Sequence, residues 1–361
     1  MAAIASSPIV VRFGAFGDLV ILTPLLHLLH RRYGQPCTLV TSGAWAEPLL
    51  GAHPDVKRIL RVGSRRRPYA LDPQQWRLTR ALRELKDAAT YVCDEFAVDK
   101  VRWLLARGGI EPERCLYLGE HPCSVEEHWV DRMLRFGCLT PPAFTANDFQ
   151  WRDDDIIREP LLHIDATDRS DCAAWLRMRS LAETPLVLLQ PGNKRTLKRG
   201  RLGLIGDDKY WPTQRWAALC HAIVKRRPEA RIVLCGSARE EAILDNISRA
   251  AALSRVHVAA ADLPPRRLLA LLERAHSLVS IDTGPAHAAA AMGCPLVVLY
   301  GAASPAHWKP RSRSGSAVTT LTSSTPNARV TDIPLHAVID AWTALPTRDV
   351  GHRALPSTPP P

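Results

Sequence analysis

The 361-residue chain lacks the features that mark membrane, secreted and disulfide-stabilised proteins. No apolar run is long enough to span a bilayer, and the first residues carry no basic segment, so we expect neither a membrane helix nor a secretion signal. The nine cysteines are scattered, with no C-x-x-C pair. Cys220, Cys235 and Cys294 fall inside apolar patterns, so we expect buried free thiols and a reducing, cytoplasmic setting.

Motifs for nucleic-acid binding are also missing. The sequence contains no helix-turn-helix, RNA-recognition or zinc-finger pattern, and its short basic runs are not interleaved with aromatic residues. We therefore expect no nucleic-acid partner, although the formal net charge is +11. The densest basic runs, 65–67 and 194–201, fit three interpretations: contact with an anionic membrane surface, contact with an anionic glycolipid, and ordinary surface charge.

Common nucleotide and metal motifs are absent as well. The glycine-punctuated loop at 14–18 has neither the G-x-G-x-x-G spacing nor the lysine of a P-loop. No Asp-x-Asp pair follows an expected strand, and the run Asp153–Asp155 is typical of a solvated turn. The residues themselves therefore give no reason to expect a dinucleotide or metal site.

What the chain does contain is an alternation of apolar strand patterns and helix patterns, which is typical of an α/β protein with parallel sheets. Ala182–Pro185 is the best candidate for a linker, so we expect domains at 1–180 and 185–330, a helix at 331–346 and a disordered tail at 347–361. The expected strands are 9–13, 37–41, 57–62, 89–93, 115–118, 186–189, 231–235, 256–258, 278–281 and 296–300, and the expected helices include 73–87, 123–137, 170–180, 213–227, 238–251 and 265–274.

One strand–turn–helix unit near the C-terminus has the form of a phosphate site. An apolar strand runs into Asp282-Thr283-Gly284, and Pro285 suits the first turn of the helix that follows. Free backbone N–H groups at the positive end of such a helix attract an anion, and His287 lies close enough to donate another hydrogen bond. An ordinary, empty turn capped by Thr283 is the alternative.

A second unit of this kind opens the chain. The strand 9–13 leads into a loop with Gly14 and Gly17, and Asp18 stands at the start of an apolar helix that ends near Tyr33. The helix dipole and the free N–H groups favour an ionised Asp18. On position alone, a simple helix cap explains this residue better than a catalytic role does.

These motifs together resemble glycosyltransferase family 9, which includes the lipopolysaccharide heptosyltransferases. Arg12-x-Gly14-x-x-Gly17-Asp18 with Thr23-Pro24 looks like the N-terminal signature of this family. The stretch from Asp282 to Pro295, followed by Tyr300-Gly301 and Trp308-x-Pro310, is similar to its C-terminal signature. The other matches, which bring the coverage to roughly 9–312, are Gln190-Pro191-Gly192, Lys209-Tyr210-Trp211-Pro212 with Trp216, and Cys235-Gly236-Ser237 with Glu240.

The resemblance implies the GT-B fold, in which two Rossmann-like, doubly wound domains face a central cleft, with the acceptor in the first domain and the donor in the second. It implies that Asp18 is the catalytic base and that Lys209 stabilises the leaving diphosphate, without a metal ion and with inversion at the anomeric carbon. Thr283, Gly284 and His287 would bind the phosphates. The predicted donor-binding residues are Gly192, Asn193, Lys209, Gly236, Glu240, Asp282, Thr283, Gly284 and His287, and the predicted acceptor-binding residues are Arg12, Gly14, Gly17 and Thr23.

Alternatives remain for single residues and for the whole chain. Glu240, which would bind the ribose, and Lys209 are each compatible with a solvated surface charge. The loop 193–208 departs from the family because Gly206-Asp207-Asp208 offers no Ser or Thr before Lys209. We expect ADP-heptose as donor, an anionic lipid A-linked oligosaccharide as acceptor, no other cofactor, and a cytoplasmic enzyme with peripheral contact to the inner membrane. The alternatives are another nucleoside diphosphate sugar or acceptor, and a non-catalytic nucleotide-sugar-binding protein.

Overall fold

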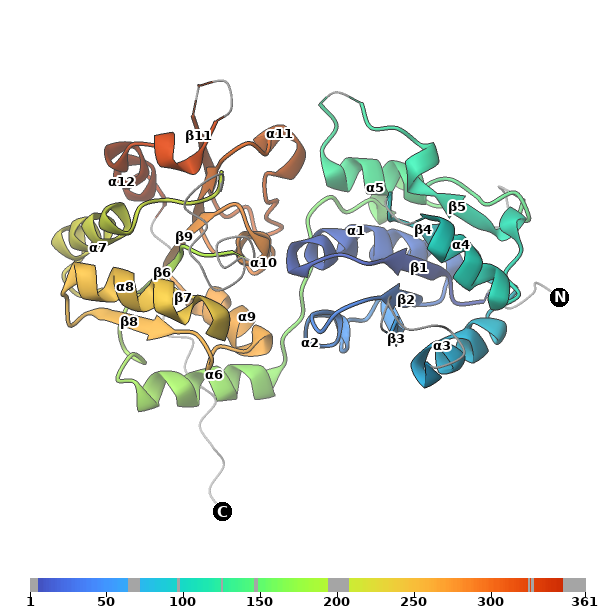
Figure 1. The fold of residues 1–361 in the computed structure, drawn as a ribbon, viewed down its shortest axis with the longest axis horizontal. Helices are drawn as coiled ribbons and strands as arrows, with labels where there is room; N and C mark the ends of the chain where they lie inside the picture. Colours follow the sequence, from blue (N-terminus) through green and yellow to red (C-terminus); the bar gives the residue numbers. More distant parts are fainter. Residues whose placement is uncertain are drawn as a thin grey trace, which may run out of the picture. The chain divides into compact units, whose positions relative to one another are not determined.

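The computed structural model describes residues 6–63, 72–95, 98–124, 126–145, 149–193, 208–323, 325 and 328–346. The chain divides into two compact units. The N-terminal unit comprises residues 1–163 and 306–313, and the C-terminal unit comprises residues 164–305 and 314–361. Each unit is built around its own parallel sheet (Figure 1).

The N-terminal sheet has five parallel strands in the order β3-β2-β1-β4-β5. In register, Ile9 pairs with Thr38 of one neighbouring strand and with Thr90 of the other. Strands β1, β2 and β4 are short and buried throughout, as expected for a parallel sheet with both faces covered, whereas the edge strand β3 is partly exposed. Their bounds are β1 (Ile9–Arg12), β2 (Cys37–Thr41), β3 (Val56–Arg61), β4 (Thr90–Val92) and β5 (Cys115–Tyr117).

Helices cover both faces of this sheet. Leu82 of α3 and Leu105 of α4 join Ile9 and Val92 of the strands in one apolar cluster. On the opposite face, Tyr91 of β4 packs edge-on against Phe136 of α5. The helices are α1 (Phe16–Tyr33), α2 (Ala46–Leu50), α3 (Pro73–Arg83), α4 (Val98–Arg107) and α5 (Trp129–Gly137), with 3₁₀ turns at Pro112–Arg114, Leu118–Glu120 and Asp153–Asp155.

The C-terminal sheet has six parallel strands in the order β11-β10-β9-β6-β7-β8, the doubly wound order of a Rossmann fold. Its central strands, such as Leu186–Gln190, are buried throughout. Cys220, Cys235 and Cys294 are buried free thiols in this unit, as predicted. The strands are β6 (Leu186–Gln190), β7 (Arg231–Cys235), β8 (Val256–Ala259), β9 (Ser277–Ile281), β10 (Leu296–Tyr300) and β11 (Val318–Thr322).

One face of the C-terminal sheet is covered by α7, α8 and α12, where Trp216, Leu244 and Trp342 share an apolar cluster with the strands. Outside this cluster, α6 contacts α9, and α9 contacts α10. The helices are α6 (Ala166–Met178), α7 (Thr213–Arg226), α8 (Glu241–Ala251), α9 (Pro265–Arg274), α10 (Gly284–Ala291) and α12 (Leu335–Thr343), with 3₁₀ turns at Ala238–Glu240 and Val330–Asp332. Helix α11 (Pro305–Trp308) lies where the chain returns to the N-terminal unit, at 306–313.

The structure differs from the predicted organisation at three places. The division between the units falls at 163/164 rather than in 182–185, because α6 packs against α9 of the C-terminal unit. Helix α5 begins at Trp129, not at 123, because the ring of His128 accepts a hydrogen bond from the Val130 N–H and caps the helix there. Strand β11 was not predicted. The basic runs 65–67 and 194–201 and the tail 347–361 lie outside the described residues.

Within the described ranges, none of the helices combines the length and the apolar composition that crossing a bilayer requires.

Candidate functional site

In each unit, predicted site residues follow a strand that flanks the switch point of the sheet. Strand β1 lies beside β4, and β6 lies beside β9, and between these neighbours the strand order reverses. In doubly wound sheets, ligands bind at the carboxyl ends of the strands at this point. Asp18 follows β1 and Asp282 follows β9, so both residues stand where such a sheet holds a ligand.

Asp18 lies in the first turn of α1 and is held from two sides. Its Oδ2 accepts a hydrogen bond of 2.7 Å from the backbone N–H of Ala15, the residue that caps the helix. Its Oδ1 is 2.6 Å from Nη2 of Arg12, at the end of β1. The side chain is 28% exposed, so the carboxylate is both anchored and accessible. Asp18 thus helps to cap α1 and also lies after the end of β1, where a doubly wound sheet binds its ligand.

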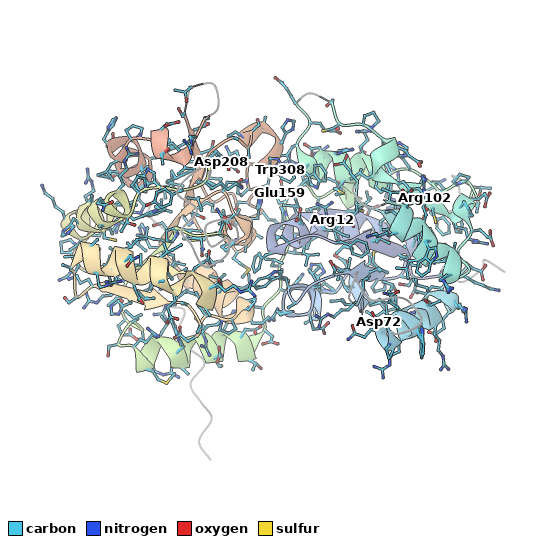
Figure 2. All side chains as sticks on the ribbon, viewed as in Figure 1. Arg12, Asp72, Arg102, Glu159, Asp208 and Trp308 are labelled. Carbon is cyan, nitrogen blue, oxygen red and sulfur yellow. The ribbon has the colours of Figure 1, made fainter. Side chains whose placement is uncertain are left out.

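Arg12, which Figure 2 labels, is a partner of Asp18. It is nearly buried, with 10% of its side chain exposed. Its Nη1 donates to the carbonyl of Cys93 at 2.7 Å and lies 3.7 Å from Oδ1 of Asp94. Asp94 also accepts the backbone N–H of Phe13 at 2.6 Å. The residues after β4 therefore fix the end of β1, and Arg12 is better described as a support for Asp18 than as an acceptor contact. Sequence reasoning missed Asp94.

Gly14 leaves the space that the Asp18 side chain occupies. A Cβ atom on Gly14 would lie 2.9 Å from Cγ of Asp18, and nearer still to its Cβ. The glycine is thus required by the position of the carboxylate. Gly17 lies beside Asp18 in the first turn of α1 and is half-buried.

Thr23 is only 1% exposed, which does not support the predicted contact with an acceptor. Because Pro24 has no N–H, it cannot donate to the carbonyl of Val20 within the helix. The hydroxyl of Thr23 donates to this carbonyl instead, at 2.8 Å, and accepts the N–H of Leu161 at 3.0 Å. The Thr23-Pro24 pair therefore stabilises α1 and anchors the segment that runs over it.

Two aromatic rings lie on the Arg12 side of this network. Trp129, at the start of α5, stacks on Trp308 with ring centroids 5.1 Å apart. The guanidinium groups of Arg12 and Arg132 lie 5.4 Å and 5.1 Å from the Trp129 ring centroid, within the range of cation–π contacts. Trp308 belongs to a motif that the sequence singled out, whereas Trp129 carried no signal of its own.

In the C-terminal unit, Lys209 forms an ion pair with Asp282. The Nζ atom of Lys209 contacts Oδ2 of Asp282 and also donates to the Asp282 carbonyl at 3.0 Å. Both side chains are mostly buried, at 17% and 10% exposed. Lys209 is therefore no solvated surface residue. The preceding residue is fixed as well, since Asp208 accepts the N–H of Ala302 at 3.0 Å.

The turn after β9 opens a helix as predicted. Thr283 occupies the N-cap of α10, its side chain makes no capping hydrogen bond, and Gly284 and Pro285 form the first turn. His287 is buried in the same helix. Nearby, burial raises the pKa of the Tyr300 phenol, and the charge of Asp282 raises it further, so Tyr300 stays neutral. The positive end of α10 thus stands directly after the residue that binds Lys209.

A buried carboxylate lies at the ends of β6 and β7. Glu240 accepts both the backbone N–H and the hydroxyl of Ser237 on one oxygen, Oε2, at 2.7 and 2.8 Å. A Cβ atom added to Gly192 would lie 2.6 Å from the other carboxylate oxygen of Glu240, Oε1. A Cβ atom added to Gly236 would lie 3.2 Å from the Cβ of Glu240. The two glycines thus make room for Glu240, which the structure places inside the fold rather than on a solvated face. Asn193 follows Gly192 and is half-buried.

Among the described residues, no group of three or more His, Cys, Asp or Glu side chains is arranged to hold a metal ion. The two sites consist of charged pairs, backbone donors and glycines that allow close approach. Such groups can take a proton from a hydroxyl, neutralise a phosphate and hydrogen-bond a sugar.

Two parallel-sheet α/β units, each with its polar residues at the switch point, define a protein of the GT-B fold. Comparison with known proteins shows which family the chain is similar to. Residues 167–337 match the model of glycosyltransferase family 9 (heptosyltransferase). The chain is 23% identical to lipooligosaccharide heptosyltransferase 2 of Haemophilus influenzae, over 82% of this chain and 83% of that protein. It is 25% identical to lipopolysaccharide heptosyltransferase 2 of Escherichia coli K12, over 85% and 86%.

Solved structures agree with this assignment of the fold. The structure of Escherichia coli ADP-heptose lipopolysaccharide heptosyltransferase II matches with a TM-score of 0.68 at 22% identity, over 94% of this chain and 98% of that one. A family 9 glycosyltransferase from Veillonella parvula matches with a TM-score of 0.73 at 16% identity, over 95% and 98%. The resemblance to glycosyltransferase family 9 is confirmed, and the chain is a glycosyltransferase.

Proposed function

We propose that this glycosyltransferase transfers a heptose from ADP-heptose to the inner core of lipopolysaccharide, with inversion and without a metal ion. The observation that carries the proposal is the anchored and accessible carboxylate of Asp18, which is bonded to Ala15 and Arg12 and accommodated by Gly14. A protein that only bound a nucleotide sugar would have no use for such a base.

Asp18 would act as the base of the reaction. Each carboxylate oxygen has two lone pairs, so the bonds to Ala15 and Arg12 leave capacity to accept the proton of an acceptor hydroxyl. As the proton moves to Asp18, the hydroxyl oxygen forms a bond to the anomeric carbon, and the bond from this carbon to the diphosphate oxygen breaks. A single displacement from the face opposite the leaving group inverts the anomeric carbon.

The leaving diphosphate carries the electron pair away and needs positive charge. Lys209 and the N-terminal turn of α10 would supply this positive charge. The two lie close together, because Lys209 binds Asp282 and Asp282 directly precedes Thr283, the N-cap of α10. Gly284 adds a backbone donor and His287 a side chain in the same turn. Asp282 would keep the Lys209 ammonium in place before the donor arrives.

Glu240 would bind the ribose of the nucleotide. It stands after β7, close to Gly192 and Gly236, and Ser237 occupies only one of its oxygens. A carboxylate at the strand ends of a Rossmann-like unit commonly accepts hydrogen bonds from ribose hydroxyls. Together with Asn193, these residues would form the nucleoside side of the donor site.

The substrate assignment rests on the relatives. The curated relatives that match most of the chain are heptosyltransferases of lipopolysaccharide or lipooligosaccharide, and one matched structure is of an ADP-heptose enzyme. The acceptor would then be an anionic, lipid A-linked oligosaccharide. We place the reaction in the cytoplasm, at the inner face of the membrane that carries this lipid.

Transfer assays with a panel of ADP-, UDP- and GDP-sugars and a deep-core lipid A acceptor, in the presence of EDTA, test the proposal. We expect product from ADP-heptose alone, with inverted configuration at the anomeric carbon by NMR. Product from another donor would overturn the heptose assignment, and product only after addition of a divalent cation would overturn metal independence.

The variant Asp18→Asn separates an enzyme from a binding protein. It keeps the shape of the side chain and removes its basicity, so turnover should fall by at least about a hundredfold. Its ADP affinity, measured by calorimetry, should stay near that of the wild type because Asp18 and the donor residues belong to different units. Undiminished turnover would refute the assignment of Asp18 as the base.

A further inference from the structure

Helices α3 and α4 of the N-terminal unit together present two tryptophans and several basic side chains to the surface. Trp76 of α3 is 49% exposed and Trp103 of α4 is 47% exposed. Burying a tryptophan is strongly favourable, so two half-exposed rings on neighbouring helices require an explanation. We call the outer surface of α3 and α4 the two-helix surface.

The two helices form one rigid support. Both bury apolar residues against the same face of the sheet, through Leu82 of α3 and Leu105 of α4. They contact each other, and Gly108 at the end of α4 permits the approach, since a Cβ there would lie 2.6 Å from Cβ of Leu82. Figure 1 shows the pair side by side, and Figure 2 labels Asp72 at the start of α3 and Arg102 on α4.

The charges on this support follow the tryptophans. On α3, Arg80 and Arg83 lie four and seven residues after Trp76, and therefore on the same side of the helix. On α4, Lys100 and Arg107 flank Trp103 at three and four residues. The guanidinium of Arg107 lies over the Trp103 ring, 4.8 Å from its centroid. Each helix thus combines one ring with two cations on a single face.

Two acidic residues that follow α3 are already paired with cations from elsewhere, whereas Asp99 of α4 is exposed and belongs to no ion pair among the described residues. Glu84 pairs with Arg58 at 3.4 Å, and Asp87 pairs with Arg114 at 3.3 Å. In contrast, Arg80, Arg83 and Lys100 form no ion pair within the described ranges. The two-helix surface therefore carries excess positive charge around two indole rings.

We propose that the two-helix surface docks the enzyme on an anionic lipid bilayer. Tryptophan prefers the interface between headgroups and acyl chains, and arginine and lysine bind the anionic headgroups. A helix with an aromatic and basic outer face lies in the plane of such an interface. The surface is formed by helices packed on a sheet, so its rings can enter the headgroup layer together, whereas a single-stranded nucleic acid needs a charged groove with stacking platforms.

This docking deepens the proposed function, because the unit that carries the two-helix surface is also the unit to which the proposal assigns the lipid-linked acceptor. Its test does not need turnover. Binding is measured by co-sedimentation of the full chain with vesicles, in the absence of nucleotide sugar and acceptor. Vesicles of phosphatidylcholine alone are compared with equimolar phosphatidylcholine and phosphatidylglycerol.

The wild type should bind the anionic vesicles, bind the neutral ones weakly, and lose affinity as salt is raised. Each basic residue near an anionic surface contributes about fivefold to the partition coefficient, so Arg80→Gln, Arg83→Gln and Lys100→Gln together should lower it about a hundredfold. The matched control is the triple variant Lys225→Gln, Arg226→Gln and Arg249→Gln, at exposed positions of the C-terminal unit, which should bind like the wild type.

The aromatic component has its own pair of variants. Trp76→Ala with Trp103→Ala should bind at least about tenfold more weakly, whereas Trp151→Ala, at another exposed tryptophan of the same unit (36% exposed), should bind like the wild type. Transfer to a delipidated, water-soluble acceptor should be unchanged in every variant, which separates docking from catalysis.

Three results would overturn the docking proposal while leaving the proposed function intact. The first is a wild type that ignores anionic vesicles. The second is equal loss of binding in the control variants, which would mean unspecific attraction by net charge. The third is tight binding of an RNA homopolymer, lost in the α3–α4 variants, without vesicle binding, which would assign the surface to nucleic acid.

Discussion

Replacing Gly14 by alanine tests the link between the loop geometry and the proposed base. The new Cβ would lie 2.9 Å from Cγ of Asp18, whereas ordinary contacts begin at 3.4 Å. The Asp18 side chain must therefore move by at least about 0.5 Å at Cγ, and by more at Cβ, or the loop must shift as a whole. Either movement lengthens or bends the hydrogen bonds from Ala15 and Arg12.

The expected effect falls on turnover rather than on donor binding. A misplacement of about 1 Å at a reacting group can cost about a hundredfold in rate, so kcat of Gly14→Ala should fall about ten- to a hundredfold. The KM for the donor should change little, since the donor residues lie in the other unit. Overpacking of this kind also costs about 1–3 kcal/mol of the free energy of unfolding.

Gly119→Ala is a matched control in the same unit. Its new Cβ would have only one neighbour, Cα of Glu95 at 3.9 Å, so activity and stability should both stay close to wild type. Steady-state kinetics and chemical denaturation of both variants are the measurements. If Gly14→Ala turned over at the wild-type rate while remaining folded, the position of Asp18 would not matter for the reaction, and the reasoning about the base would be refuted.

Three further predictions follow from the two sites and from one buried histidine. Asp94→Asn removes the charge beside Arg12 but keeps the shape of the side chain, so kcat should fall several-fold without loss of folding; unchanged kinetics would mean that Asp94 does not support the base. Glu240→Gln should raise the donor KM about tenfold at nearly constant kcat, and a change in kcat alone would contradict ribose binding. Burial lowers the pKa of His53 from 6.5 to about 4. Between pH 6.5 and about pH 4, His53 is therefore protonated in the unfolded chain and neutral in the folded chain. As the pH falls through this range, His53 should lower the free energy of unfolding by about 3 kcal/mol. Denaturation curves at several pH values should show a flatter dependence in His53→Phe and an unchanged one in His221→Gln, whose side chain is exposed.

Most of the fold follows from patterns within short segments, and the differences arise where tertiary contacts decide. The sequence predicts ten of the eleven strands that the structure describes, and most of these ten are compact apolar runs. Strand β11 was not predicted because about half of the residues in Val318–Thr322 are polar, as an edge strand allows. Its pairing with β10, which the local sequence does not reveal, makes this segment a strand. Helix α12 begins at Leu335, after Pro334, although its apolar pattern starts earlier; residues 330–332 form a 3₁₀ turn instead.

The position of the unit boundary could not be read from composition. Ala182–Pro185 looks like a linker because a Pro precedes a strong strand, whereas the chain leaves the N-terminal unit already at 163. The two hydrogen bonds from Arg169 of α6 to Glu273 of α9, at 2.7 and 2.8 Å, connect residues 104 positions apart. Patterns within a short segment of sequence cannot predict hydrogen bonds between residues so far apart in the chain.

The same reasoning explains which site residues were found. Asp18, Lys209 and Asp282 lie in recognisable local motifs, but the partners that give Arg12 its supporting role come from the end of β4, about eighty residues away. Strand order makes them neighbours, because β4 lies beside β1 on the side opposite β2. In the C-terminal unit the equivalent position, after the fourth strand, holds Asp282, which the motif did reveal. A polar residue after the fourth strand of a Rossmann-like unit should therefore be examined as a partner of the loop after the first strand, even where no motif marks it. By that rule, the sequence predicts Asp94 as such a partner once the doubly wound strand order is assumed.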